Sequence, residues 1–350
     1  MTRTGPRIFL PVIGLLLALA GCATMGFTPI PVVGDGFRIP PGFRIVGYFP
    51  SWSGEPANVQ YQALTHINYA FLAVNKEGGY QAVPHPEKLD ELVAVAHAYG
   101  VKVLVSLGGY NDGKTDAFEA VAADAGITSL FIDNTLALVD DHLLDGVDID
   151  WEYPSLAAAD NYAALMRSLA ARLHSAGKLL TAAVSATDFH GSAIPDSVIA
   201  DVDFLNIMAY DDGYGQPGVH HSTYDFASDA IYYWRNYRNA PGPKLVLGVP
   251  FYGRSLKDRH SRTFKGIFAG DSAAPGKDVS GDFGYNGFAT LRDKTLRLAH
   301  NLGGGIMIWQ IAQDAPGTAS LLNAIFDAVK VPREQPAIDD GSPSANRGSP

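Results

Sequence analysis

Eight short apolar segments, separated by stretches with helical periodicity, constrain the fold more than any other feature of the sequence. The expected strands are Arg44–Phe49, His66–Ala73, Lys102–Ser106, Gly146–Glu152, Leu179–Ser185, Phe204–Tyr210, Lys244–Pro250 and Gly305–Gln310. Such alternation is typical of parallel βα units, and eight strands are the number that closes a barrel. The sequence therefore predicts an α/β fold, the (β/α)8 TIM barrel. A doubly wound open sheet is the alternative, but no glycine-rich nucleotide motif follows the first strand.

The N-terminal segment has the pattern of a bacterial lipoprotein signal peptide. Arg3 and Arg7 precede an apolar run from Ile8 to Ala20, which is shorter than the ~20 residues of a spanning helix. The run ends in Leu-Ala-Gly-Cys, so residues 1–21 are the expected signal peptide and Cys22 the expected lipidated residue. A signal peptide with an incidental cysteine is the alternative. We expect a protein of the bacterial cell envelope, anchored by lipid at the periplasmic or surface face of a membrane, such as the outer membrane.

The remaining chain divides into a tether, one domain and a tail. Residues 22–42 are rich in proline and glycine and predict a tether. Residues 332–350 are polar and predict a disordered tail, which leaves residues 43–331 for a single barrel. Cys22 is the only cysteine, so no internal disulfide is expected. The net charge of −10, without a basic stripe, argues against nucleic acid as a partner. We expect a monomer.

One expected strand carries carboxylates along a single face. In "DGVDIDWEYP" (145–154), Asp148, Asp150 and Glu152 alternate with apolar residues. Alternate side chains of a barrel strand point inward, so the three acids form a row with neighbours ~7 Å apart. Two charges at that separation repel by ~2.4 kcal/mol at an effective dielectric of ~20, equivalent to ~1.7 pKa units. One acid is therefore expected to stay protonated near neutral pH, as a general acid requires.

A metal site and a solvated acidic edge are the alternatives for this acid row. The apolar residues between the acids indicate a buried strand, and the spacing differs from that of a calcium loop. His190, His220 and His221 have no acid or cysteine at a useful spacing, so we expect them to be loop or groove residues. The sequence thus predicts no metal and no cofactor. Asp145 is expected to brace the start of the strand, and Trp151 to face a helix.

Several motifs resemble those of glycoside hydrolase family 18, the chitinase family. The acid row is similar to the family's DxxDxDxE signature. "VSLGG" (Val105–Gly109) resembles its third-strand SxGG motif and "MAYD" (Met208–Asp211) its sixth-strand MxYD motif. The other similar segments are "GYF" (Gly47–Phe49), "NYAF" (Asn68–Phe71), "GVPFYGR" (Gly248–Arg254) and "GGIMIWQIAQD" (Gly304–Asp314). The motifs follow the family order over about residues 43–330.

The resemblance implies hydrolysis of β-1,4-linked N-acetylglucosamine polymers, such as chitin, by a retaining mechanism in which the substrate's acetamido oxygen attacks. Glu152 would be the general acid/base, and Asp150 would bind the acetamido N–H. Asp148 would share a proton with Asp150, and Tyr210 would donate to the acetamido carbonyl. The other residues implied at the substrate are Asp211, Trp309, Tyr48, Phe71, Met208, Arg254, Tyr110 and Gly109, with Ser106 beneath the acids. The family also implies cis peptides at Ala70–Phe71, Glu152–Tyr153 and Trp309–Gln310.

The chain also departs from the family pattern. Tyr110 stands where many members have tryptophan, which bears on the first leaving-group subsite. Residues 255–303 are too few for the large α+β insertion found in some members, so we expect a shallow groove open at both ends. A peptidoglycan N-acetylglucosaminidase and an N-glycan endo-β-N-acetylglucosaminidase are alternatives. The substrate of each enzyme contains N-acetylglucosamine, which could bind at the same site. A chitin-binding lectin would lose the acid, whereas Glu152, Asp150 and Tyr210 are all present here.

Overall fold

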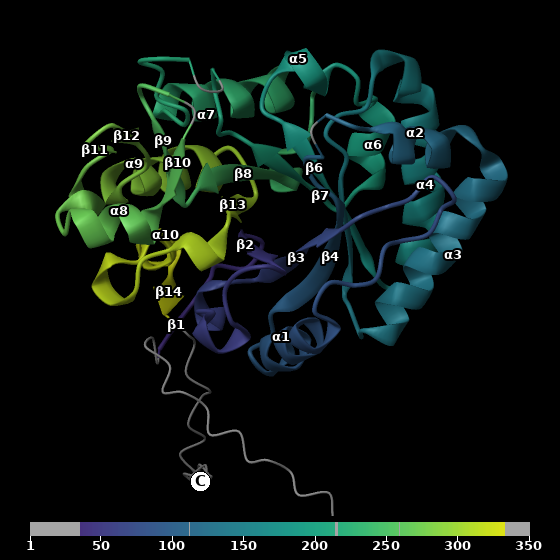
Figure 1. The fold of residues 1–350 in the computed structure, drawn as a ribbon, viewed down its shortest axis with the longest axis horizontal. Helices are drawn as coiled ribbons and strands as arrows, with labels where there is room; N and C mark the ends of the chain where they lie inside the picture. The colour runs from purple at the N-terminus through teal and green to yellow at the C-terminus, as the bar shows by residue number, and fades with distance from the viewer. Residues whose placement is uncertain (1–35, 112, 214–215, 259, 333–350) are drawn as a thin grey trace, which may run out of the picture. The chain divides into compact units, whose positions relative to one another are not determined.

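Eight parallel strands close into a barrel, as predicted (Figure 1). The strands are β2 (Arg44–Pro50), β3 (His66–Leu72), β4 (Lys102–Gly108), β5 (Gly146–Asp150), β6 (Leu179–Ser185), β7 (Phe204–Met208), β8 (Leu245–Pro250) and β13 (Gly305–Trp309). They pair in the order β13-β2-β3-β4-β5-β6-β7-β8, and β8 pairs with β13 to close the ring. Every expected strand is present, with ends that shift by no more than two residues.

The computed structural model describes residues 36–332, except 112, 214, 215 and 259. The expected signal peptide, Cys22 and residues 22–35 of the tether lie outside the described residues, as do residues 333–350 of the expected tail. Phe37–Arg38, placed in the tether by the sequence analysis, forms β1 and pairs antiparallel with β14 (Val331–Pro332). The Lys330 ammonium lies 4.8 Å from the centre of the Phe37 ring and adds a cation–π contact to this pairing.

Helices surround the barrel, and the longer ones present an apolar face to the strands (Figure 1). They are α1 (Pro86–Ala98), α2 (Asp116–Ala123), α3 (Ala125–Asp141), α4 (Ala159–Ser175), α5 (Asp188–Gly191), α6 (Asp196–Asp201), α7 (Tyr224–Tyr232), α8 (Phe264–Gly270), α9 (Phe288–Asp293) and α10 (Leu321–Val329). In α4 the buried residues recur at helical spacing from Tyr162 to Leu173. None of the helices in the described ranges is both long and apolar enough to span a bilayer.

The side chains of β5 and the residues after it point alternately to the two sides of the barrel wall, as the sequence predicts. Val147, Ile149 and Trp151 belong to the core between strands and helices. The Trp151 ring stacks on Phe118 with centroids 5.2 Å apart, so it is a core residue as expected. The intervening Asp148 and Asp150 are buried on the other side. The barrel interior holds its own small apolar cluster, formed by Val46, Tyr48, Ala70, Phe204, Val246 and Met307.

A small antiparallel sheet fills the connection between β8 and β13. Its strands are β9 (Tyr252–Ser255), β10 (Ser261–Thr263), β11 (Val279–Ser280) and β12 (Phe283–Gly284), in the order β10-β9-β12-β11. Figure 1 shows these strands and α8 together on one side of the barrel. The segment is small, which agrees with the expected absence of a large α+β insertion. The sheet itself was not among the strands expected from the sequence, and its strand β9 carries Tyr252 and Arg254 to the site.

Candidate active site

The predicted site residues meet in a cavity of about 1260 Å³ where the barrel strands end. This is the end of a TIM barrel at which active sites lie. The predicted residues that line the cavity are Tyr48, Phe71, Gly109, Tyr110, Asp150, Glu152, Met208, Tyr210, Asp211, Arg254 and Trp309. Asp148 lies below them, fully buried in the barrel. The structure therefore brings together every catalytic and binding residue that the sequence predicted.

Asp148 is held by four hydrogen-bond donors from four strands. The Tyr48 hydroxyl (2.7 Å) and Ser106 Oγ (2.8 Å) donate to its Oδ2. Thr181 Oγ1 (2.5 Å) and Asn206 Nδ2 (3.1 Å) donate to its Oδ1. Burial raises the pKa of Asp148, and the four hydrogen bonds oppose that rise. Of these donors, Thr181 and Asn206 were not expected at the site, although both occupy inward positions, Thr181 on β6 and Asn206 on β7.

Asp150 has far fewer partners than Asp148. Its Oδ1 is buried and has no hydrogen-bond partner among the described residues. Burial raises the pKa of Asp150 well above its ordinary value, and the charges of Glu152 and Asp148 raise it further. The structure does not show the proton-sharing pair that the resemblance implied, because four other donors occupy both oxygens of Asp148. Asp150 is thus left with an acceptor oxygen facing a cavity large enough for a ligand.

Glu152 lies at the top of the row, beyond the last residue of β5. Burial raises its pKa from 4.5 to about 7, the Tyr153 hydroxyl opposes the rise, and the charge of Asp211 adds to it. Near neutral pH a large share of Glu152 is therefore protonated, as expected for one acid of the row. A carboxylic acid that keeps its proton at pH 7 beside an open cavity can donate that proton to a bound molecule.

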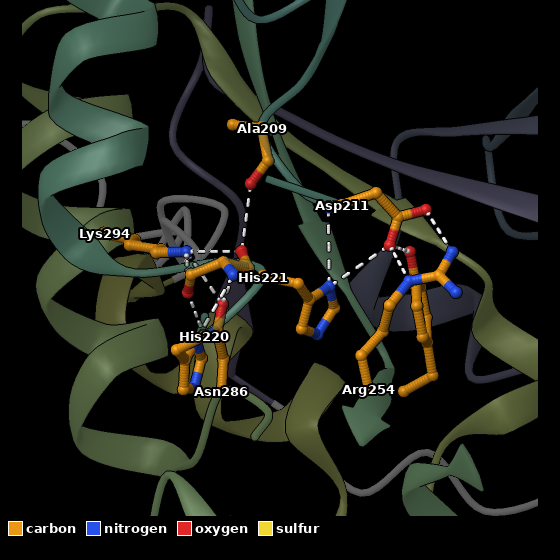
Figure 2. Close-up of polar contacts among 9 residues, drawn as sticks. Ala209, Asp211, His220, His221, Arg254, Asn286 and Lys294 are labelled. Atoms are coloured by element: carbon orange, nitrogen blue, oxygen red, sulfur yellow. Dashed lines mark hydrogen bonds and ion pairs between the residues drawn. The ribbon is translucent and has the colours of Figure 1, made fainter. Parts of the chain in front are cut away.

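Hydrogen bonds and ion pairs fix Asp211 as an anion (Figure 2). The Arg254 guanidinium donates from Nε to Oδ1 (2.5 Å) and from Nη2 to Oδ2 (2.7 Å), and the Tyr252 hydroxyl donates to Oδ1 (2.8 Å). Burial alone would raise the pKa of Asp211, but Arg254 and His221 outweigh it and hold the pKa well below its usual range. Asp211 adopts a left-handed backbone conformation (φ 61°), which turns the chain at the end of the "MAYD" motif.

His221 lies in the loop after β7, as expected, but it is buried there as a partner of Asp211. Its Nδ1 lies 3.3 Å from Asp211 Oδ1, and the side chain is 1% exposed. The neighbouring His220 directs Nε2 toward the carbonyl of Tyr285 (2.9 Å), which links the loop after β7 to the small sheet. The two histidines are adjacent in sequence, and nothing in the sequence indicated that they would have different partners.

A buried lysine, Lys294, lies near His220 and Asn286 (Figure 2). Lys294 Nζ donates to Ser222 Oγ (2.8 Å) and to Asn286 Oδ1 (2.8 Å), and Ser222 Oγ in turn donates to the carbonyl of Ala209. Burial lowers the pKa of Lys294 to about 7. The network ties the loop that carries His221 to the end of β7, so it fixes the backbone from which Asp211 projects.

Aromatic rings form the opposite wall of the cavity. Trp309 and Phe71 stack with centroids 5.3 Å apart, and the edge of Tyr48 meets Trp309 at 5.7 Å. Trp52, which is 59% exposed, extends this wall outward from Trp309. The wall also explains the glycine at position 109. Gly109 has φ 87°, and a Cβ there would lie 2.6 Å from the Phe71 ring.

The remaining predicted features of the pocket are also in place. The peptide bonds Ala70–Phe71, Glu152–Tyr153 and Trp309–Gln310 are all cis, as the resemblance implied. The Tyr210 hydroxyl points toward Met307 Sδ at 3.9 Å, inside the barrel mouth. Tyr110 is 65% exposed at the rim. Asp145 braces the start of β5, because its Oδ2 accepts the Val103 N–H (2.7 Å) and contacts His97 Nε2 (2.9 Å).

Comparisons with known proteins agree with this geometry. Residues 44–314 match the family model described as glycosyl hydrolases family 18. A solved structure, the GH18 chitinase ChiB from the chitin utilization locus of Flavobacterium johnsoniae, is 30% identical with a TM-score of 0.74, over 82% of this chain and 94% of that one. An endochitinase of Brugia malayi is 28% identical over 85% of this chain and 75% of its own length.

A third relative is much longer than this chain. The probable chitinase 10 of Drosophila melanogaster is 25% identical over 79% of this chain, and the alignment covers 13% of that protein. The family match covers more than half of the 350 residues, so the chain belongs to glycosyl hydrolases family 18.

Proposed function

We propose that the protein hydrolyses β-1,4-linked N-acetylglucosamine polymers, chitin or chito-oligosaccharides, by a retaining and substrate-assisted mechanism. Glu152 donates its proton to the glycosidic oxygen and then, as a carboxylate, activates the water that completes the reaction. The acetamido oxygen of the substrate attacks the anomeric carbon in place of an enzyme carboxylate. Retention follows because two successive displacements occur at the same carbon.

The observation that carries this proposal is the contrast between Asp150 and its neighbours. The Oδ1 of Asp150 is buried and has no hydrogen-bond partner among the described residues. Glu152, two residues later in the chain, is an acid with a raised pKa. A buried acceptor left unpaired costs about 1–3 kcal/mol, so a ligand that brings a donor to it gains that energy. The acetamido N–H of N-acetylglucosamine is such a donor. Its binding also orients the acetamido oxygen toward the anomeric carbon. The positive charge of the oxazolinium ion then favours the ionised form of Asp150, which stabilises that ion.

Two variants test the roles of these acids. Glu152→Gln keeps the shape of the side chain but has no proton to give, so hydrolysis of chitohexaose should be lost while the affinity for it is kept. Asp150→Asn removes the charge that stabilises the oxazolinium ion, so kcat should fall by a factor of 10² or more. Glu87→Gln is the matched control, because Glu87 lies on α1 with a side chain 75% exposed. Its activity should equal that of the wild type.

The substrate and the stereochemistry test the mechanism. Chitin oligomers, purified sacculi and a high-mannose glycoprotein, digested side by side, separate the chitinase proposal from the peptidoglycan and N-glycan alternatives. Fully deacetylated chitosan should bind without being cleaved, since it lacks the acetamido oxygen. Fresh products, followed by NMR, should appear first as the β anomer. An initial α anomer, or rapid hydrolysis of deacetylated chitosan, would contradict substrate assistance.

A further inference from the structure

Lys294 is a buried cation whose hydrogen bonds all go to neutral oxygens (Figure 2). Its Nζ donates to the carbonyl of Ser222 (3.0 Å), to Ser222 Oγ (2.8 Å) and to Asn286 Oδ1 (2.8 Å). Asp278 contributes an opposite charge, but both of its carboxylate oxygens accept hydrogen bonds from other groups. An ammonium group has three N–H donors and no acceptor, so these three oxygens saturate it.

The backbone at Lys294 turns two successive side chains inward. Lys294 begins a π-helical segment (Lys294–His300) that continues α9. Both Lys294 and the next residue, Thr295, are completely buried there. π-Helical turns are rare and occur often at functional sites. A buried charge without an opposite charge beside it costs several kcal/mol. Two uncommon features therefore coincide at the residue that holds Ser222.

The ammonium group determines where the hydroxyl of Ser222 directs its proton. Ser222 Oγ has one proton and two acceptors near it, the carbonyl of Ala209 at 2.9 Å and Asn286 Oδ1 at 3.4 Å. Lys294 donates to Oγ and also to Asn286 Oδ1, so it satisfies the second acceptor and leaves the hydroxyl proton for Ala209. Without the ammonium group, Asn286 Oδ1 would compete with Ala209 for that proton.

The carbonyl of Ala209 directly precedes Tyr210 and Asp211 in the "MAYD" motif. Ala209 lies beyond the last paired residue of β7, so strand pairing does not hold it. The side chain of Asp211 has an anchor of its own in Arg254. Among the described residues, the polar contact of the Tyr210 hydroxyl is with Met307 Sδ at 3.9 Å, which is a weak acceptor. The placement of this hydroxyl therefore depends on the backbone that Ala209 anchors.

We propose that Lys294 is a positioning residue for Tyr210. The Ser222 hydroxyl and the Ala209 carbonyl transmit its effect, so that the Tyr210 hydroxyl lies where it donates to the acetamido carbonyl of the substrate. Lys294 itself is fully buried and does not line the cavity, so it acts through these contacts alone. The inference rests on the proposed function, in which the oxygen of that carbonyl is the nucleophile and must be held toward the anomeric carbon.

A double-mutant cycle on chitohexaose hydrolysis tests this link. Lys294→Met should lower kcat about tenfold, equivalent to ~1.4 kcal/mol. On the Tyr210→Phe background, where the hydroxyl is already absent, the same substitution should change kcat by less than about twofold. Ser222→Ala removes the hydroxyl but leaves the ammonium group two acceptors, and its effect should depend on Tyr210 in the same way. Lys102→Met is the matched control, because Lys102 is exposed at the start of β4, away from the cavity.

A structural role alone would give a different result. Damage to the fold lowers kcat equally on the wild-type and Tyr210→Phe backgrounds, and that outcome would overturn the inference while the proposed function stands. An unchanged kcat in both Lys294→Met and Ser222→Ala would also overturn it. Urea denaturation shows whether each variant is folded in the assay, and if Lys294→Met is not, Ser222→Ala decides between these results. A wild type that does not cleave chitohexaose would refute the proposed function itself.

Discussion

The raised pKa of Glu152 has a consequence for stability that is independent of any substrate. Glu152→Gln removes an ionisable group that the folded protein prefers to keep protonated. Because burial disfavours the carboxylate, the wild type loses stability once that group ionises, whereas the glutamine variant does not. We therefore expect the inactive variant to be the more stable protein at alkaline pH.

The size and the sign of the effect follow from the two pKa values. In the unfolded chain the group titrates at its ordinary value of 4.5, and in the folded protein at about 7. Between these values the folded state binds more protons, so the free energy of unfolding falls as the pH rises. At ~1.4 kcal/mol per pKa unit, the full loss is about 3 kcal/mol and is complete above about pH 8. At pH 5 the loss of stability is still below about 1 kcal/mol.

Urea denaturation of the wild type and of Glu152→Gln at pH 5 and pH 8.5 measures this difference. The gap between the two free energies of unfolding should widen by on the order of 2–3 kcal/mol from the lower to the higher pH. Glu87→Gln, at an exposed position, should stay within about 0.5 kcal/mol of the wild type at both. A gap between wild type and Glu152→Gln that does not change with pH would refute the reasoning, because Glu152 would then titrate alike in both states.

Four other predictions concern activity, the Asp211 pair, cleavage pattern and anchoring. Turnover should fall as the pH rises through about 7, since the general acid Glu152 loses its proton there; a pH–rate profile flat to pH 9 would contradict this. Arg254→Met should lower the free energy of unfolding at pH 7 by on the order of 2 kcal/mol, because Asp211 loses its guanidinium partner. The loss should shrink in urea titrations below pH 3.8, where Asp211 of the unfolded chain becomes protonated while the folded wild type keeps it ionised. A soluble long-chain chitin derivative should lose viscosity early, whereas disaccharide release at constant viscosity would exclude internal cleavage. Cys22→Ser should move the protein from the membrane to the soluble fraction of the cell, and a variant that stays membrane-bound would exclude the lipid anchor.

The barrel could be predicted because its strands carry a local signal. Each of the eight is at least five residues long and mostly apolar, and in β5 the acids alternate with the apolar residues. The small sheet carries no such signal. Its strands β11 and β12 have two residues each, and β12 pairs with β9, about thirty positions earlier in the chain. Pairing at that range depends on tertiary contacts, which periodicity does not contain.

The residues of the candidate site that lie within the motifs were predicted. Hydrogen-bond partners that lie outside the motifs were not. Thr181 and Asn206 could have been found, since both are polar residues at inward positions of β6 and β7, the two strands that follow β5 in the barrel. His221 could not, because its burial against Asp211 depends on how the loop after β7 folds back.

The acid row shows how the fold limits the stability cost of its site. A carboxylate buried without partners costs several kcal/mol, and three in one strand would be hard to tolerate. Asp148, the deepest, is compensated by donors from four different strands, so that its burial also ties the barrel together. Compensation decreases toward the mouth, where Asp150 keeps an unpaired oxygen and Glu152 a raised pKa. The uncompensated energy is thus confined to the two carboxyls that face the cavity, which are the two that a bound sugar can reach.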